Sequence, residues 1–247
     1  MMKKRNDDDR QLIEAVRSAA LPLDAGGDDF QAVVDLIGDA PCVLLGEASH
    51  GTHEFYAGRA RITQSLIAQK GFHAVAIEGD WPDAYRVNRF VRGLGSDDAS
   101  PEEALRGFQR FPTWMWRNAD VLDFIGWLHE HNQARPPPER VGFYGLDLYS
   151  LHSSMGAVLD YLESAHPEAA PLARERYACF DQFGDDSQLY GLLTGVRGMQ
   201  GCEDQVIANL VDVRRRFAAA VRTGQADAED AFDAEQNARL VGNAEAY

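Results

Sequence analysis

A short segment near residue 50 combines two imidazoles with carboxylates, the side chains that most often move protons near neutral pH. It reads Gly46-Glu47-Ala48-Ser49-His50-Gly51-Thr52-His53-Glu54. A neutral histidine can take a proton from water, and a carboxylate beside it can orient the ring and stabilise its charged form. Because His50 lies in a glycine-flanked loop beside two acids, we expect it to carry general-base chemistry with a neighbouring carboxylate.

Other carboxylates follow apolar runs that are typical of buried parallel strands. The runs and the acids after them are Cys42–Gly46 with Glu47, Ala74–Ile77 with Glu78 and Asp80, and Val141–Leu146 with Asp147. Ligands of parallel sheets gather at the carboxyl ends of the strands, so we expect these acids to share one edge with His50. The alternative for each acid is that it caps the helix that follows.

The apolar runs alternate with segments of helical periodicity, and this alternation predicts an α/β fold. We expect helices near residues 55–71, 83–91 and 153–164, and a parallel sheet flanked by helices in a single domain over residues 1–247. Its additions would be a helical lead-in over 1–40, a helical insertion over 101–133 and a helical C-terminal part over 167–247, broken near Gly184 and Gly224. Three strands form a small sheet and the last segment has no stop signal, so we expect an incomplete domain.

The insertion carries an aromatic cluster that begins Phe111-Pro112-Thr113-Trp114-Met115-Trp116. Such clusters are most often simply core. Two tryptophans this close cannot both face the core side of a helix, so we expect one of Trp114 and Trp116 to line a ligand pocket.

The charge balance restricts the class of partner. The chain has 24 Lys and Arg against 39 Asp and Glu, a formal net charge of -15. Nucleic acids and anionic membranes select positive surfaces, so we expect a small-molecule substrate and neither of those partners. No secretory signal or membrane span is evident, and the three cysteines, Cys42, Cys179 and Cys202, are too few for a disulfide framework. We predict a cytoplasmic protein, with self-association through unpaired strand edges.

Several common catalytic signatures are absent, which narrows the chemistry. There is no Gly-x-Ser-x-Gly elbow, no phosphate-binding Gly-Lys-Ser/Thr loop, no Gly-x-Gly-x-x-Gly and no His-Glu-x-x-His. Acid-base chemistry by His and Glu remains, and we predict no metal and no cofactor. Two alternatives stay open: a non-catalytic ligand-binding module, and a metal-dependent hydrolase that uses Glu47, His50, His53 and Glu78, although their spacing matches no specific metal signature.

The segment Leu45–Phe55 resembles the signature loop of the erythromycin esterase family, in which Gly-Glu-Ala/Ser-Thr/Ser-His-Gly-Thr leads to Glu-Phe and then an Arg. Further blocks that resemble the family follow in order, namely Ile77–Pro82, Val87-Asn88, Trp114–Asn118 and Phe143–Ser150. The family places a second functional His in a later Ala-His-Asn-x-His block, and no such block follows His166.

The resemblance implies hydrolysis of the ester of 14-membered macrolides, hence antibiotic resistance, by a water that a histidine activates on an α/β scaffold with helical additions. The matching positions imply catalytic roles for His50, Glu47, Glu78 and Arg59, which is better spaced than Arg61. We expect the substrate contacts to come from His53, Asp80, Trp81, Trp114, Trp116 and Asp147.

Overall fold

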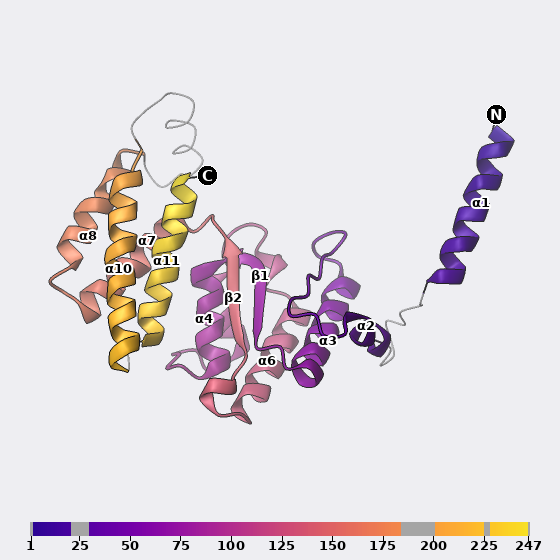
Figure 1. The fold of residues 1–247 in the computed structure, drawn as a ribbon, viewed down its shortest axis with the longest axis horizontal. Coiled ribbons are helices and arrows are strands. Elements are labelled where there is room, and N and C mark those ends of the chain that lie inside the picture. Colours follow the sequence, from indigo (N-terminus) through magenta and orange to yellow (C-terminus); the bar gives the residue numbers. More distant parts are fainter. Residues whose placement is uncertain (1, 21–29, 184–200, 225–227, 247) are drawn as a thin grey trace. The chain divides into compact units, whose positions relative to one another are not determined.

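The computed structural model describes residues 2–20, 30–183, 201–224 and 228–246, and the chain divides into two compact units, Met1–Phe72 and His73–Tyr247 (Figure 1). The first unit contains the helices α1 (Met2–Ala19), α2 (Gln31–Ile37) and α3 (His53–Lys70). The second contains the strands β1 (Ala74–Asp80) and β2 (Gly142–Asp147) and the helices α4 (Trp81–Arg92), α5 (Pro101–Ala104), α6 (Ala119–Gln133), α7 (Leu151–Ala165), α8 (Ala170–Tyr177), α10 (Glu203–Thr223) and α11 (Ala228–Ala246). Short 3₁₀ turns are η1 (Leu105–Gly107), η2 (Thr113–Met115), η3 (Pro137–Glu139) and η4 (Ala178–Phe183).

In the first unit, α3 has clear signals at both ends. Glu54 lies in its first turn and Lys70 in its last, which suits the helix dipole, and Gly71 ends it in the left-handed conformation. Ile62 and Leu66 are among its buried residues. Helical periodicity therefore predicted this element correctly.

The prediction of a strand over Cys42–Gly46 is wrong. These residues form neither helix nor strand in the structure, and Leu44 is 91% exposed. An apolar run becomes a strand only where a neighbouring strand pairs with its backbone groups, and within the described residues only β1 and β2 pair. The composition of the run carries no information about such a partner.

The sheet of the second unit has the predicted parallel topology. Ala74 lies opposite Gly142 and Ile77 opposite Gly145, and after an irregularity Asp80 lies opposite Asp147. Helix α4 packs against both strands and runs beside β2 in Figure 1. Because the two strands are parallel, their carboxyl ends share one edge, which carries Glu78, Asp80 and Asp147. The α/β class is confirmed, whereas the predicted third strand of this edge is not formed.

Two buried asparagines attach the helices to β2. Asn88 of α4 accepts a hydrogen bond from the Phe143 amide at 3.0 Å. Asn132 of α6 donates to the carbonyls of Val91 and Val141 and accepts from the Val141 amide at 2.8 Å. These amide side chains are hydrogen-bond partners for backbone groups just before the strand, at Val141, and within it, at Phe143, which lies opposite Val75 of β1.

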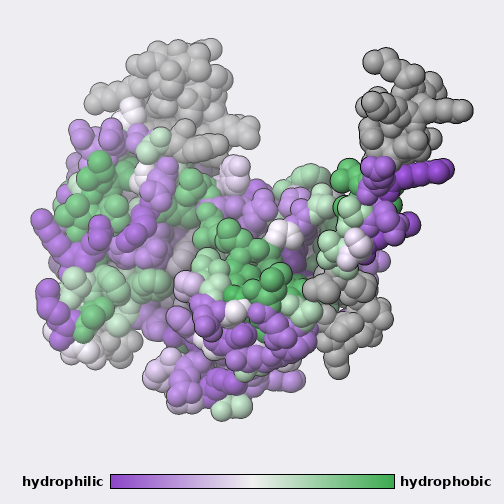
Figure 2. All heavy atoms as spheres, turned by 45° about the vertical axis from the view of Figure 1, so that its right-hand side comes forward, coloured by the Kyte–Doolittle hydropathy of each residue, from purple (hydrophilic) through white to green (hydrophobic). Residues whose placement is uncertain are grey.

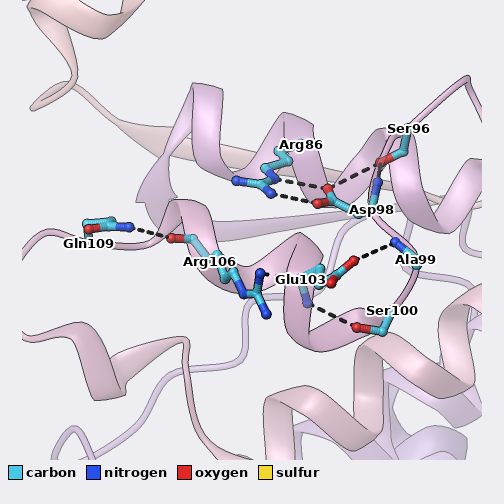
Figure 3. A network of polar contacts seen from close by, with 8 residues as sticks. All are labelled: Arg86, Ser96, Asp98, Ala99, Ser100, Glu103, Arg106 and Gln109. Atoms are coloured by element: carbon cyan, nitrogen blue, oxygen red, sulfur yellow. Dashed lines mark hydrogen bonds and ion pairs between the residues drawn. The ribbon is translucent and has the colours of Figure 1, made fainter.

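The predicted insertion over 101–133 is helical mainly at its two ends, and residues 108–112 have no regular secondary structure. Figure 3 shows the polar network that holds its beginning. Ser100 caps α5 by accepting from the Glu103 amide, while Glu103 accepts from the Ala99 amide, a reciprocal arrangement typical of helix starts. Arg86 of α4 holds Asp98 through two hydrogen bonds of 2.9 and 2.6 Å. These contacts hold the chain at the start of the insertion, around α5, before the irregular residues 108–112.

The described residues of the C-terminal part are mainly helical, as predicted, and α10 and α11 lie along each other (Figure 1). These helices share a hydrophobic core with α7, which includes Val158 of α7, Val206 of α10 and Val241 of α11. Cys179 and Cys202 form a disulfide with their Cα atoms 5.9 Å apart, and Cys42 is free and exposed. The small number of cysteines did not predict this bond, since only the fold brings the start of α10 to η4. Gly224 ends α10 as expected, and Gly184 lies outside the described residues.

Helices α4 and α11 are joined by polar contacts. The Trp81 indole donates to Asp233 at 2.7 Å, Tyr85 donates its hydroxyl to the Glu229 carbonyl at 3.0 Å, and Arg92 makes two hydrogen bonds to the Glu229 carboxylate. The Trp81 ring also stacks on Tyr85. The described contacts of Trp81 are thus contacts within the fold.

These contacts predict a pH dependence of stability. Burial raises the pKa of Asp233 from 3.8 to about 6, against hydrogen bonds from Trp81 and Asn237 that lower it. The folded chain therefore holds this proton more tightly than the unfolded chain, and the free energy of unfolding falls as the pH rises from about 4 to about 6. We expect Asp233→Asn to make this fall shallower in urea unfolding between pH 4 and 7. Asp204→Asn, at an exposed aspartate in the first turn of α10, is the matched control, and equal slopes in all three proteins would contradict the prediction.

On the surface, apolar and charged residues are interspersed over the face shown in Figure 2. Large exposed apolar side chains include Leu146, Tyr149, Leu172 and Ile207. Among the described residues, no helix is both long and apolar enough to cross a membrane.

Candidate functional site

The loop before α3 brings two of the predicted catalytic side chains together. Gly51 has a φ of +79°, a left-handed conformation that suits glycine and turns the chain between His50 and Thr52. Thr52 then starts α3 with an extended backbone, and its carbonyl accepts from the amides of Phe55 and Tyr56. The turn folds His50 back towards Glu47.

Glu47 contacts two of the other predicted catalytic residues. Its Oε1 lies 2.5 Å from His50 Nδ1, and its Oε2 lies 2.7 Å from an Nη atom of Arg59. The Glu47 side chain is only 8% exposed, whereas that of His50 is 42% exposed. A largely buried carboxylate thus contacts Nδ1 of an imidazole whose side chain is partly exposed.

Arg59 is in turn held by an aromatic ring. Its guanidinium carbon lies 4.8 Å from the ring centre of Tyr56, one turn earlier on α3. Burial raises the pKa of the Tyr56 hydroxyl, and Glu47 adds to the rise while Arg59 opposes it. The neutral Tyr56 ring contacts Arg59 without adding a charge next to the Arg59–Glu47 ion pair.

In the second unit, an arginine that the sequence did not single out joins two of the predicted acids. Arg110 Nε donates to Asp80 at 2.9 Å and Arg110 Nη2 donates to Asp147 at 2.8 Å. Asp80 ends β1 and Asp147 ends β2. Of the other residues predicted at this edge, Glu78 has its carbonyl bound by the Trp116 indole at 2.8 Å.

A small cavity of about 40 Å³ opens at this edge. It is lined by Glu78, Gly79, Asp80, Asp83, Phe108, Arg110, Phe111, Pro112, Thr113, Met115 and Trp116. Trp116 therefore faces the cavity, whereas Trp114 is 46% exposed and is not part of its wall.

The acids at this edge are electrostatically coupled. Burial raises the pKa of Asp83 to about 6, and the charge of Asp80 contributes to the rise. Burial also raises the pKa of Asp147, while the charge of Arg110 opposes that rise. Asp83 is thus a carboxyl group that can exchange a proton near neutral pH, and sequence reasoning missed it because an aspartate in the first turn of a helix usually serves the helix dipole.

The structure therefore brings seven of the ten predicted site residues together in two groups, one in each unit. Glu47, His50 and Arg59 form the first group. Asp80 and Asp147, joined by Arg110, form the second, with Glu78 and Trp116 beside them. Within the described residues, no set of three or more His, Cys, Asp or Glu is arranged to hold a metal ion.

Comparison with known proteins relates the chain to one family. Residues 67–247 match the family model described as erythromycin esterase. A relative from Escherichia coli, "Erythromycin esterase type II", is 30% identical over 146 residues, which are 58% of this chain and 32% of the relative. A "Putative hydrolase YbfO" from Bacillus subtilis is 24% identical over 175 residues, 69% of this chain and 37% of the relative. The chain thus spans about a third of the length of these relatives.

Solved structures agree in fold. A "succinoglycan biosynthesis protein" has a TM-score of 0.70 at 22% identity and covers 96% of this chain and 56% of its own. A mutant of the erythromycin esterase EreC in its open conformation has a TM-score of 0.56 at 17% identity, covering 90% of this chain and 53% of its own. At these identities the likeness concerns the fold alone.

Proposed function

The chain belongs to the erythromycin esterase family, and we propose that it takes part in hydrolysis of a carboxylic ester or lactone by a water that His50 activates. The observation that carries the proposal is the 2.5 Å contact between His50 Nδ1 and Glu47. With the proton of the ring on Nδ1 and directed at Glu47, Nε2 is left as the base. A base of this kind is what attack by water on an ester carbonyl requires.

In the proposed reaction, His50 takes up one proton and later returns it. His50 Nε2 takes a proton from water as the oxygen adds to the ester carbonyl, and the imidazolium is stabilised by the Glu47 carboxylate. When the tetrahedral intermediate collapses and the ester C–O bond breaks, His50 returns the proton to the departing alcohol. Arg59, which holds the second oxygen of Glu47, keeps that carboxylate in place.

The remaining predicted residues are proposed as substrate contacts and, beside Glu47, as the second catalytic carboxylate. We assign the acid role to Glu78, and substrate contacts to His53, Asp80, Trp81, Trp114, Trp116 and Asp147. The substrate class is a neutral or cationic small molecule such as a macrolide. A net charge of -15 supports this choice, because opposite charge raises the encounter rate. The cytoplasmic location and self-association remain predictions.

The experiment is mass spectrometry of a macrolide panel, headed by erythromycin, after incubation with the chain and its His50→Ala variant. We expect the unmodified chain to add one water to a panel member and His50→Ala to lose this activity, because the variant lacks the imidazole that takes the proton from water. His152→Ala, a histidine of α7 outside both groups, is the matched control.

Three results would count against the proposal. Absence of hydrolysis by the unmodified chain would favour a ligand-binding module. Full activity of His50→Ala would remove His50 from the mechanism. Loss of activity on exhaustive chelation, restored by a divalent metal, would favour the metal-dependent alternative.

A further inference from the structure

Residues 108–116, which we call the crossing segment, contact the ends of both strands. Arg110 binds the carboxylates that end β1 and β2, and the Trp116 indole binds the Glu78 carbonyl on β1. The Phe108 and Trp116 rings lie 6.1 Å apart. Two side chains from one segment thus hold Glu78 and Asp80 on β1 and Asp147 on β2.

Gly79 lets the crossing segment approach the strand. A Cβ atom at this position would lie 3.2 Å from a ring carbon of Phe108 and 3.3 Å from the indole nitrogen of Trp116. Both distances are shorter than ordinary van der Waals contact, so a side chain here would require Phe108 and Trp116 to move by a few tenths of an ångström, as well as Ile77, whose Cδ1 would lie 3.0 Å away. Glycine at position 79 therefore permits the close approach of Phe108 and Trp116 to β1.

Arg110 is suited to hold two separate carboxylates. Its guanidinium presents donors in a fixed plane, and it uses Nε for Asp80 and Nη2 for Asp147. The carboxylates are well buried, with side chains 9% and 16% exposed. The guanidinium carbon also lies 4.5 Å from the ring centre of Tyr149, which fixes the plane further.

The electrostatics agree with this geometry. Two aspartates at adjacent strand ends repel each other when both are charged, and Asp80 raises the pKa of Asp147. Arg110 lies between them and opposes that rise. Without it, the two strand ends would lose the group that compensates their charge.

We propose that Arg110 is a positioning residue: by bridging Asp80 and Asp147 it fixes the spacing of the two strand ends and so the backbone that carries Glu78. It acts on the reaction through this edge and does not itself meet the reacting atoms. The inference rests on the proposed function, because the role of Glu78 as the second acid belongs to that proposal.

The test compares Arg110→Met and Arg110→Lys in the full chain, with Arg106→Met as the matched control. Arg106 is an exposed arginine four residues earlier whose described partner is Glu103 at 3.8 Å. The first readout is the indole N–H signal of Trp116 in a ¹H–¹⁵N spectrum, assigned with Trp116→Phe. The second is kcat and KM for erythromycin.

We expect Arg110→Met to move the Trp116 signal well beyond the shift in Arg106→Met, and to lower kcat at least about tenfold with KM changed less than about twofold. Arg110→Lys restores the charge but not the planar fork, so we expect it to leave kcat well below that of the unmodified chain. A smaller change in Arg110→Lys than in Arg110→Met would still agree with bridging.

Other outcomes would overturn either the positioning role of Arg110 or the proposed function. A Trp116 signal that moves no more than in Arg106→Met overturns the positioning role, whatever the activity. If the unmodified chain hydrolyses erythromycin, an unchanged kcat in Arg110→Met, or a full kcat in Arg110→Lys, overturns it as well. If the unmodified chain hydrolyses no panel member, the proposed function fails, and the Trp116 signal alone decides whether Arg110 holds the edge.

Discussion

Replacing Glu47 by glutamine is expected to lower kcat by about 10²–10⁴-fold, the range that general-base catalysis contributes. The amide keeps the shape of the side chain and can still accept from His50 Nδ1. It has no charge, however, with which to stabilise the imidazolium that forms when His50 takes the proton. It also leaves Arg59 without the carboxylate oxygen that lies 2.7 Å away.

The measurement is kcat for erythromycin beside the melting temperature, so that loss of catalysis is separated from loss of fold. Glu54→Gln is the matched control, because Glu54 is an exposed glutamate in the first turn of α3. We expect its kcat to stay within about twofold of the unmodified chain. A Glu47→Gln protein that is folded and fully active would show that His50 needs no charged partner, and the proposed dyad would be abandoned.

The second large effect is on stability. We expect Asn132→Ala to lower the free energy of unfolding by more than about 3 kcal/mol. The change removes three hydrogen bonds and leaves the Val91 carbonyl and both backbone groups of Val141 without that partner. Each buried polar group left unpaired costs about 1–3 kcal/mol. Val91 and Val141 are 0% and 3% exposed, so bulk water does not replace the lost partner.

Urea unfolding followed by tryptophan fluorescence checks this prediction. All four tryptophans belong to the unit His73–Tyr247, so the signal reports the unit that contains Asn132. Gln133→Ala is the control, because Gln133 is the exposed next residue of α6, and we expect it to change the free energy by less than about 0.5 kcal/mol. Equal unfolding midpoints for the two variants would contradict the prediction.

Local signals located most of the elements. Pro82 in the first turn of α4 and Gly93 after its last turn mark the ends of that helix, and Gly71 does the same for α3. Such signals act through the φ angle and the free amides of a few neighbouring residues, so they are legible in the chain itself. The two strands of the sheet were likewise predicted within a few residues. The erythromycin esterase resemblance was also carried by local blocks of residues and is confirmed.

Other features depend on residues far apart in the chain. The run Cys42–Gly46 has the composition of a strand, but composition does not provide a pairing partner. Cys179 and Cys202 are separated by 23 positions and meet only when α10 starts beside η4. Arg110 is 30 residues from Asp80 and 37 from Asp147, and nothing in its neighbourhood in the sequence marks it.

The sequence by itself therefore determined the α/β class, the family, the candidate residues Glu47 and His50 of one loop, and the acids at the ends of β1 and β2. These depend on periodicity, on a motif of eleven consecutive positions and on the turn at Gly51. Only the tertiary structure decided that Arg110 bridges Asp80 and Asp147, and that burial near Asp80 brings the pKa of Asp83 to about 6. The physical reason is that a bridge and a desolvated charge depend on what lies nearby in space, which the order of residues alone does not state.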